Sequence, residues 1–196
     1  MTTPISADAM TTLFLGARTA NGFLPEAVPD ALLEQLYNVL KMGPTGANSG
    51  PARFVFVRTS EGKAKLLQAV SAGNVEKTTS APVTVIVAYD MEFYEKLPKL
   101  MPHVDARAWY AGNDASILAT ATQSGTLGGA YLIMAARALG LDAGPMGGFN
   151  ADKVNELFFE GTTWRANFLV NLGHADTTKT HPRLPRLDFA EACKWA

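Results

Sequence analysis

Four short segments of the chain, and a fifth near its end, carry residue types suited to holding an anionic or heterocyclic ligand. The first spans residues 17–23 and contains Arg18, Thr19 and Asn21. A planar guanidinium matches the oxygens of a phosphate, and short hydroxyl and amide groups suit a polyol or a heterocycle. A surface arginine in a loop would explain the same residues, so from this segment alone both interpretations stay open.

The second segment, residues 44–51, lies directly before an apolar run. It includes Pro44, Thr45, Gly46 and Asn48. Two glycines and two prolines fix a loop whose backbone can approach a ligand closely. Ordinary turn chemistry between a helix and a strand would account for every one of these residues as well.

The third segment pairs an amide with a cation. Asn74 and Lys77 are three residues apart, which places them on one face of a helix. A solvated helix face is the usual meaning of such a pair.

The fourth segment, residues 144–149, is predicted to be a loop after a long helix. It contains Pro145, Met146, Gly147 and Gly148. The backbone N–H groups of the two glycines could face a planar ring without interference from side chains. The glycine order and setting are not those of a dinucleotide fingerprint, and no P-loop lysine follows.

The fifth segment, residues 181–186, places Arg183 and Arg186 on a chain stiffened by two prolines. Two arginines on an extended chain suit a phosphate, and they equally suit an acidic partner surface. Nucleophile elbows and H-E-x-x-H motifs are absent from the sequence, and its three histidines lack metal spacing. We therefore identify no catalytic side chain and no metal site, and an enzyme here would need a cofactor.

Composition narrows the class of protein. The chain has 196 residues, 47% of them hydrophobic, and a formal charge of −1, which gives no electrostatic reason to expect nucleic acid or an anionic membrane. Cys193 is the only cysteine, which suits a reducing cytoplasm. Residues 115–136 are uncharged but interrupted by polar side chains, so they predict a helix buried in a core or dimer seam rather than a membrane span.

The apolar pattern predicts helices alternating with strands around one sheet, in a single domain covering residues 1–196. Asp30 is the expected N-cap of the first predicted helix, and Gly125 and Gly129 share one face of the long one, which indicates close packing. The predicted helices cover residues 29–41, 117–141 and 152–158, and the predicted strands, buried on both faces, cover residues 53–57, 83–89 and 167–172.

Taken in order, the five segments resemble the FMN-dependent nitroreductase family over nearly the whole chain. Four residues of the first segment fall on the family pattern R-R-S-x-R-x-F, and four of the second fall on P-S-x-x-N-x-Q-P-W: Arg18, Thr19, Asn21 and Phe23, then Pro44, Thr45, Asn48 and Pro51. Ala17 and Asn21 stand where the family has arginines, and Gly50 and Ala52 replace its Gln and Trp.

The resemblance implies a role for each segment. Asn74 and Lys77 would contact the flavin pyrimidine, the backbone N–H of Gly147 or Gly148 would meet flavin N5, and Arg183, with Arg186 as a second candidate, would hold the phosphate. It also implies an α+β three-layer sandwich with a central mixed sheet. The protein would be an obligate homodimer with FMN at the interface, reduced by NADH or NADPH and passing the hydride to a small molecule.

A narrower resemblance is to the malonic semialdehyde reductase subgroup of pyrimidine catabolism, which reduces malonic semialdehyde to 3-hydroxypropionate. It is carried by four segments, among them a Leu-Pro-Lys-Leu insertion, at residues 31–37, 51–58, 97–103 and 182–187. A general nitroaromatic or quinone reductase of the same family is the alternative enzyme. A flavin-binding or flavin-sequestering protein is the alternative outside enzymes.

Overall fold

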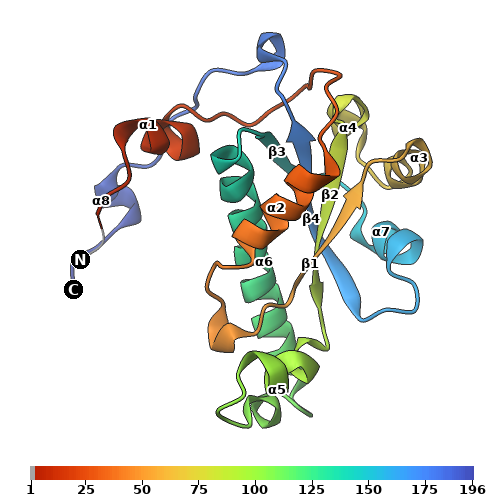
Figure 1. The fold of residues 1–196 in the computed structure, drawn as a ribbon, viewed down its shortest axis with the longest axis vertical. Helices are drawn as coiled ribbons and strands as arrows, with labels where there is room; N and C mark the ends of the chain where they lie inside the picture. Colours follow the sequence, from red (N-terminus) through yellow and green to blue (C-terminus); the bar gives the residue numbers. More distant parts are fainter. Residues whose placement is uncertain (1–2) are drawn as a thin grey trace.

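A four-stranded sheet lies between two layers of helices in the computed structural model, which describes residues 3–196 (Figure 1). The strand order is β1-β2-β4-β3. The strands are β1 (Ala52–Val57), β2 (Val83–Asp90), β3 (Asp142–Met146) and β4 (Trp164–Gly173). The expected three-layer α+β sandwich is confirmed, but each neighbouring pair of strands is antiparallel, so the expectation of a mixed sheet is wrong for residues 3–196.

The helices differ widely in length, and one of them dominates the fold. Short 3₁₀ or π turns lie between several of them, including a π turn at Thr11–Leu15. The helices are α1 (Ala7–Met10), α2 (Asp30–Leu40), α3 (Ser60–Leu67), α4 (Ala72–Ser80), α5 (Leu97–Leu100), α6 (Asp114–Ala138), α7 (Ala151–Phe158) and α8 (Phe189–Ala192).

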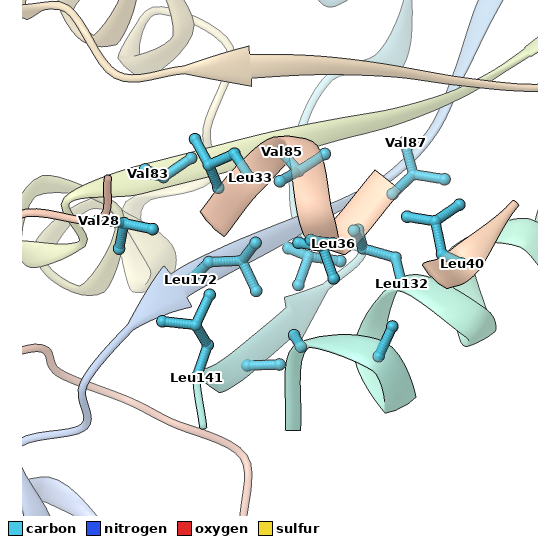
Figure 2. Close-up of a cluster of buried hydrophobic side chains, with 14 residues drawn as sticks. Val28, Leu33, Leu36, Leu40, Val83, Val85, Val87, Leu132, Leu141 and Leu172 are labelled. Atoms are coloured by element: carbon cyan, nitrogen blue, oxygen red, sulfur yellow. The ribbon is translucent and has the colours of Figure 1, made fainter. Parts of the chain in front are cut away.

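Helices α2 and α6 cover one face of the sheet (Figures 1 and 2). Along β2 the side chains alternate, so that Val83, Val85 and Val87 point to this layer. Figure 2 shows them meeting leucines from α2, α6 and β4. The labelled members of this cluster are Val28, Leu33, Leu36, Leu40, Val83, Val85, Val87, Leu132, Leu141 and Leu172.

Helices α3 and α7 cover the opposite face, where Ile86 and Ala88 of β2 point. Because both faces are covered, the central strand β2 is buried almost throughout, as its apolar run predicted. The edge strand β1 is only half-buried along most of its length, so the expectation that it is buried on both faces is wrong.

Strand β3 lies where the sequence predicts a loop over residues 144–149. It is short and contains Gly144 and Pro145, residues that weaken a strand prediction. Pro145 is tolerated because β3 is an edge strand, where a proline without an N–H can leave the ladder to its neighbour intact.

Several helix boundaries also differ from the prediction, and the largest differences are at the two ends of α6, which ends at Ala138 rather than at residue 141. Helix α6 begins three residues earlier than expected, where the Asn113 side chain accepts a hydrogen bond from the backbone N–H of Ser116. Pro29, not Asp30, is the N-cap of α2. Asp30 lies in the first turn, where a carboxylate is favourable, and pairs with Arg58.

The glycines of α6 let that helix lie directly on the sheet, which confirms the close-packing interpretation. A Cβ added at Gly125 would lie 2.8 Å from the Cβ of Tyr89, and one at Gly128 would lie 2.5 Å from the Cβ of Ala52. No helix within residues 3–196, α6 included, combines the length and hydropathy needed to cross a bilayer.

Replacing Gly129 with alanine should destabilise the fold. The new Cβ would lie 2.3 Å from Cζ of Phe168 and 2.9 Å from Cγ1 of Val87, so the packed layers must separate. Urea unfolding should show that the free energy of unfolding falls by about 1–3 kcal/mol. The matched control is Gly73→Ala in α4, where the added Cβ meets nothing within 4 Å and about 0.5–1 kcal/mol should be gained. Equal stability of the two variants would contradict this packing.

Candidate functional site

The first and fifth predicted segments line one strongly basic cavity. Its volume is about 510 Å³, and its lining contains four arginines and a histidine but no aspartate or glutamate. A concave site lined by positive charges, with no negative charge beside them, attracts an anion. The lining residues are Phe14, Leu15, Ala17, Arg18, Thr19, Asn21, Arg137, His181, Pro182, Arg183, Leu184 and Arg186.

Two of these arginines are held by backbone carbonyls at the end of the π turn. Nη2 of Arg183 donates to the carbonyl of Leu15 at 2.6 Å and to that of Ala17 at 3.0 Å. Nη1 of Arg18 donates to the carbonyls of Gly16 at 2.9 Å and Ala17 at 3.0 Å. The two guanidinium groups therefore share an anchor. Within residues 3–196, the other nitrogen atoms of both groups donate no hydrogen bond to the protein.

Arg186 is less firmly placed. Its Nη1 bonds only to the adjacent carbonyls of Leu184 and Pro185, at 2.9 and 3.0 Å. Arg137 of α6 lines the same cavity and lies outside the five predicted segments. No sequence signal distinguishes this residue from an ordinary arginine in the last turn of a helix.

The first segment also lies against the strand that leads into the fourth. The backbone N–H of Ala20 donates to the carbonyl of Ala143 at 3.1 Å, and a Cβ on Gly144 would lie 2.5 Å from the Ala20 carbonyl oxygen. Only a glycine permits this approach. The contact brings Thr19 and Asn21 beside β3.

The fourth segment divides between core and surface. Pro145 and Met146 belong to β3, and the Met146 side chain packs in the core, where its sulfur accepts a hydrogen bond from the Thr78 hydroxyl. Only the backbone of Met146 is therefore available to a ligand. Gly147 is open, with nothing within 4 Å of an added Cβ. Its bare backbone could accept a flat ring.

The third segment meets the fourth directly. Asn74 and Lys77 lie on one face of α4, as predicted, and both are half-buried. Nδ2 of Asn74 donates to the carbonyl of Gly148 at 2.9 Å. Any ligand over Gly147 would thus lie near this helix.

A salt bridge ties α4 back to the first segment. Nζ of Lys179 lies 2.6 Å from Oε1 of Glu76, and the Lys179 side chain packs on Gly22. The hydrogen bond from Lys179 lowers the pKa of the Glu76 carboxyl. The first, third, fourth and fifth segments therefore form a continuous series of contacts.

The second segment lies apart from the others. It lines a separate cavity of about 600 Å³ that shares no residue with the basic cavity. Among the described residues around it are Tyr37, Leu40, Lys41, Pro44, Thr45, Asn48, Arg53, Phe54, Lys96, Lys99, Gly128 and Tyr131. Gly46 lies nearby, with Oγ of Ser124 in α6 3.7 Å from an added Cβ.

The loop of the second segment is strained and anchored. Ala47 and Asn48 have φ values of 54° and 49°, a left-handed conformation unusual for residues other than glycine. Nδ2 of Asn48 donates to the carbonyl of Leu100 in α5 at 2.8 Å, and the Tyr131 hydroxyl of α6 donates to the Pro44 carbonyl at 2.8 Å. Strain held in place by such contacts is typical of binding loops.

Four cations surround this second cavity, and none of its lining residues is acidic. Arg53 is neutralised by Asp90, whose Oδ2 lies 2.7 Å from Nη2 of the arginine. Within residues 3–196, neither Lys96 nor Lys99 forms a salt bridge. Their charges remain available to an anion.

Comparison with known proteins places the chain in a family. The Nitroreductase family pattern matches residues 15–174, so the chain belongs to the nitroreductase family. A relative from Ralstonia nicotianae is 60% identical over 93% of each chain, and one from Stenotrophomonas maltophilia is 56% identical over the whole of both. Both carry the name "Putative NADH dehydrogenase/NAD(P)H nitroreductase".

Solved structures share the fold at low sequence identity. A nitroreductase from Exiguobacterium sibiricum, crystallised in complex with FMN, has a TM-score of 0.87 at 22% identity over the whole of both chains. An enone reductase of gut-bacterial fatty acid saturation has a TM-score of 0.82 at 21% identity, covering 98% of this chain and 99% of its own.

Replacing Asn48 with alanine should loosen the second segment. The variant loses the hydrogen bond to Leu100 and keeps a left-handed backbone that alanine disfavours, so the free energy of unfolding should fall by about 1–3 kcal/mol. Hydrogen exchange should rise at residues 46–50 and 97–101. Asn38→Ala, which removes only a surface contact to Lys41, should stay within about 0.5 kcal/mol of wild type. Equal unfolding free energies and equal hydrogen exchange in the two variants would refute the anchoring role of the hydrogen bond from Asn48 to Leu100.

Proposed function

We propose that this chain binds FMN and acts as an NAD(P)H-dependent oxidoreductase. One observation carries the proposal: four segments distant in sequence meet as a series that runs from a basic cavity to an open glycine backbone. A flavin mononucleotide has a dianionic phosphate at one end and a flat ring at the other. The donors present fit both ends. The FMN complex of a structural relative supports this cofactor, and the names of the sequence relatives support NAD(P)H as the reductant.

Each segment then has a defined task. Arg18 and Arg183 would bind the phosphate, with Arg186 as a second candidate at the end of the chain, and Thr19 and Asn21 would donate or accept hydrogen bonds along the same cavity. Guanidinium groups already held by carbonyls need little reorganisation to bind an anion.

At the ring end, the backbone of Pro145, Met146, Gly147 and Gly148 would face the flavin, with a glycine N–H directed at N5. Asn74 and Lys77 would hold the pyrimidine edge, where the lysine stabilises the negative charge of the reduced ring. When bound, FMN supplies the hydride chemistry, accepting from NADH or NADPH and delivering to an acceptor.

A homodimer with FMN at its interface is part of the proposal. Pro44, Thr45, Gly46 and Asn48 lie apart from the other segments in one chain, so they would reach the cofactor held by a second copy. The terminal segments extend away from the sheet (Figure 1). They expose large apolar side chains that a partner could cover: Phe14, Leu15, Leu184, Leu187, Phe189 and Trp195.

For the acceptor we propose a small aldehyde acid, malonic semialdehyde, reduced to 3-hydroxypropionate in pyrimidine catabolism. Lys96 and Lys99 support it, because two unpaired ammonium groups beside the second segment could bind a carboxylate. Nitroaromatic or quinone reduction is the second candidate, favoured by the names of the relatives.

The visible spectrum of the purified protein and its bleaching by NADH or NADPH test the proposed function. We expect flavin absorbance after mixing with FMN and gel filtration, bleaching under anaerobic NAD(P)H, and recovery of colour on adding malonic semialdehyde. A colourless protein would refute FMN binding. Bound flavin that neither nucleotide reduces would indicate a flavin-binding protein that is not an enzyme, and recovery with a quinone alone would select the second candidate.

Replacing Lys99 with methionine should selectively weaken use of a carboxylate acceptor. The variant keeps the length of the side chain but removes its charge, so KM for malonic semialdehyde should rise about tenfold, as losing ~1.4 kcal/mol would produce. KM for an uncharged quinone should not change. Lys65→Met on α3, outside both cavities, is the matched control and should leave both constants unaltered. An unchanged KM for malonic semialdehyde in Lys99→Met would remove this lysine from the acceptor site.

A further inference from the structure

We propose that Arg137 is a third phosphate-binding cation of the FMN site, supplied by α6. The inference rests on the proposed FMN binding. It assigns a cofactor contact to a helix that carries none of the five segments from which the site was predicted.

Three guanidinium groups are arranged around one turn of backbone. Nη1 of Arg137 donates to the carbonyl of Leu13 at 2.8 Å. Arg183 is bound by the next carbonyls along the chain, beginning at Phe14 at 3.0 Å, and Arg18 by those of Gly16 and Ala17. The carbonyls of residues 13–17 thus orient cations from three separate parts of the sequence towards one cavity.

No acidic side chain within residues 3–196 lines the cavity to balance the charge of its arginines. Burial lowers the pKa of Arg137, the nearby Asp142 carboxylate opposes this, and the charge of Arg183 lowers the pKa further. Asp142 does not line the cavity, and its Oδ2 already accepts a hydrogen bond from the backbone N–H of Ala175 at 2.8 Å. Like charges held together in this way favour a bound anion, and a phosphate dianion satisfies them.

Stabilising the end of α6 does not account for the position of Arg137. Cations favour helix C-termini, but the carbonyls of Ala135, Ala136 and Arg137 in the last turn of α6 already accept hydrogen bonds from the backbone N–H groups of residues 139–141. The arginine instead reaches across to Leu13, 124 residues away in sequence. Its side chain joins two segments of the cavity rather than capping its own helix.

The sequence supplies a reason for such a cation. Ala17 and Asn21 both line the basic cavity, and neither carries a charge. Arg18 is therefore the only cation that the first segment contributes. Arg137 approaches the same cavity from α6 and supplies a further planar donor there.

Titration of the apoprotein with FMN and with riboflavin tests the proposal, because the two flavins differ only in the phosphate. Wild-type protein should bind FMN more tightly than riboflavin. In Arg137→Gln the Kd for FMN should rise at least tenfold while the Kd for riboflavin stays the same. Arg137→Lys should recover part of the loss, since it restores the charge without the planar guanidinium. Arg165→Gln, at an exposed position on β4 outside the cavity, should bind both flavins as wild type does.

Equal weakening of both flavins by Arg137→Gln, or no change in either, would overturn the role of Arg137 and leave FMN binding intact. Wild-type protein that binds neither flavin would overturn the proposed function itself. If Arg137→Gln does not fold by circular dichroism, the ratio of the FMN and riboflavin Kd values in Arg137→Lys decides. A ratio equal to that of wild type and of Arg165→Gln would refute the specific contact of the guanidinium.

Discussion

Direct contact between the glycine face of α6 and the sheet fixes the helix against three of the four strands. Gly125, Gly128 and Gly129 bring the helix so close to β1, β2 and β4 that an added methyl group would overlap the sheet. Glycine weakens a helix by about 1 kcal/mol per residue, so the close layer contact must offset several such losses. A helix fixed in this way can position groups at several points along its length.

Both cavities depend on that fixed helix. About two turns before its C-terminal end, Tyr131 holds the strained loop of the second segment through Pro44. At its C-terminal end, Arg137 reaches the carbonyl of Leu13. The two positions are about 9 Å apart along the axis, at about 1.5 Å per residue. One rigid element therefore supports both the anion-binding basic cavity and the separate cation-rich cavity of the second segment.

The sequence was informative where local pattern decides structure. The apolar runs located β1, β2 and β4, and helical periodicity located α2, α6 and α7, because these elements face a core and repeat at the expected spacing. Strand β3 could not be predicted because Gly144 and Pro145 have low strand propensity and its partner, β4, is not adjacent in sequence. The antiparallel order could not be found either, since long-range pairing leaves no local signal.

The site was harder to predict than the fold. Residue type and order were enough to identify the five segments. They could not predict that four of the segments meet while the second lies apart, because that depends on how α4, β3 and the chain ends pack together. Met146 was selected for its neighbours and proved to be a core residue. Arg137 could not be selected at all, because its significance comes from the carbonyl it reaches and the cations beside it.

If the basic cavity binds the phosphate of FMN, a crystal structure of the protein grown with FMN will show it there. We expect the phosphate oxygens within hydrogen-bonding distance of the Arg18 and Arg183 guanidinium groups, with the flavin ring extending towards Gly147. A phosphate bound elsewhere, or a flavin ring lying in the basic cavity, would refute this assignment.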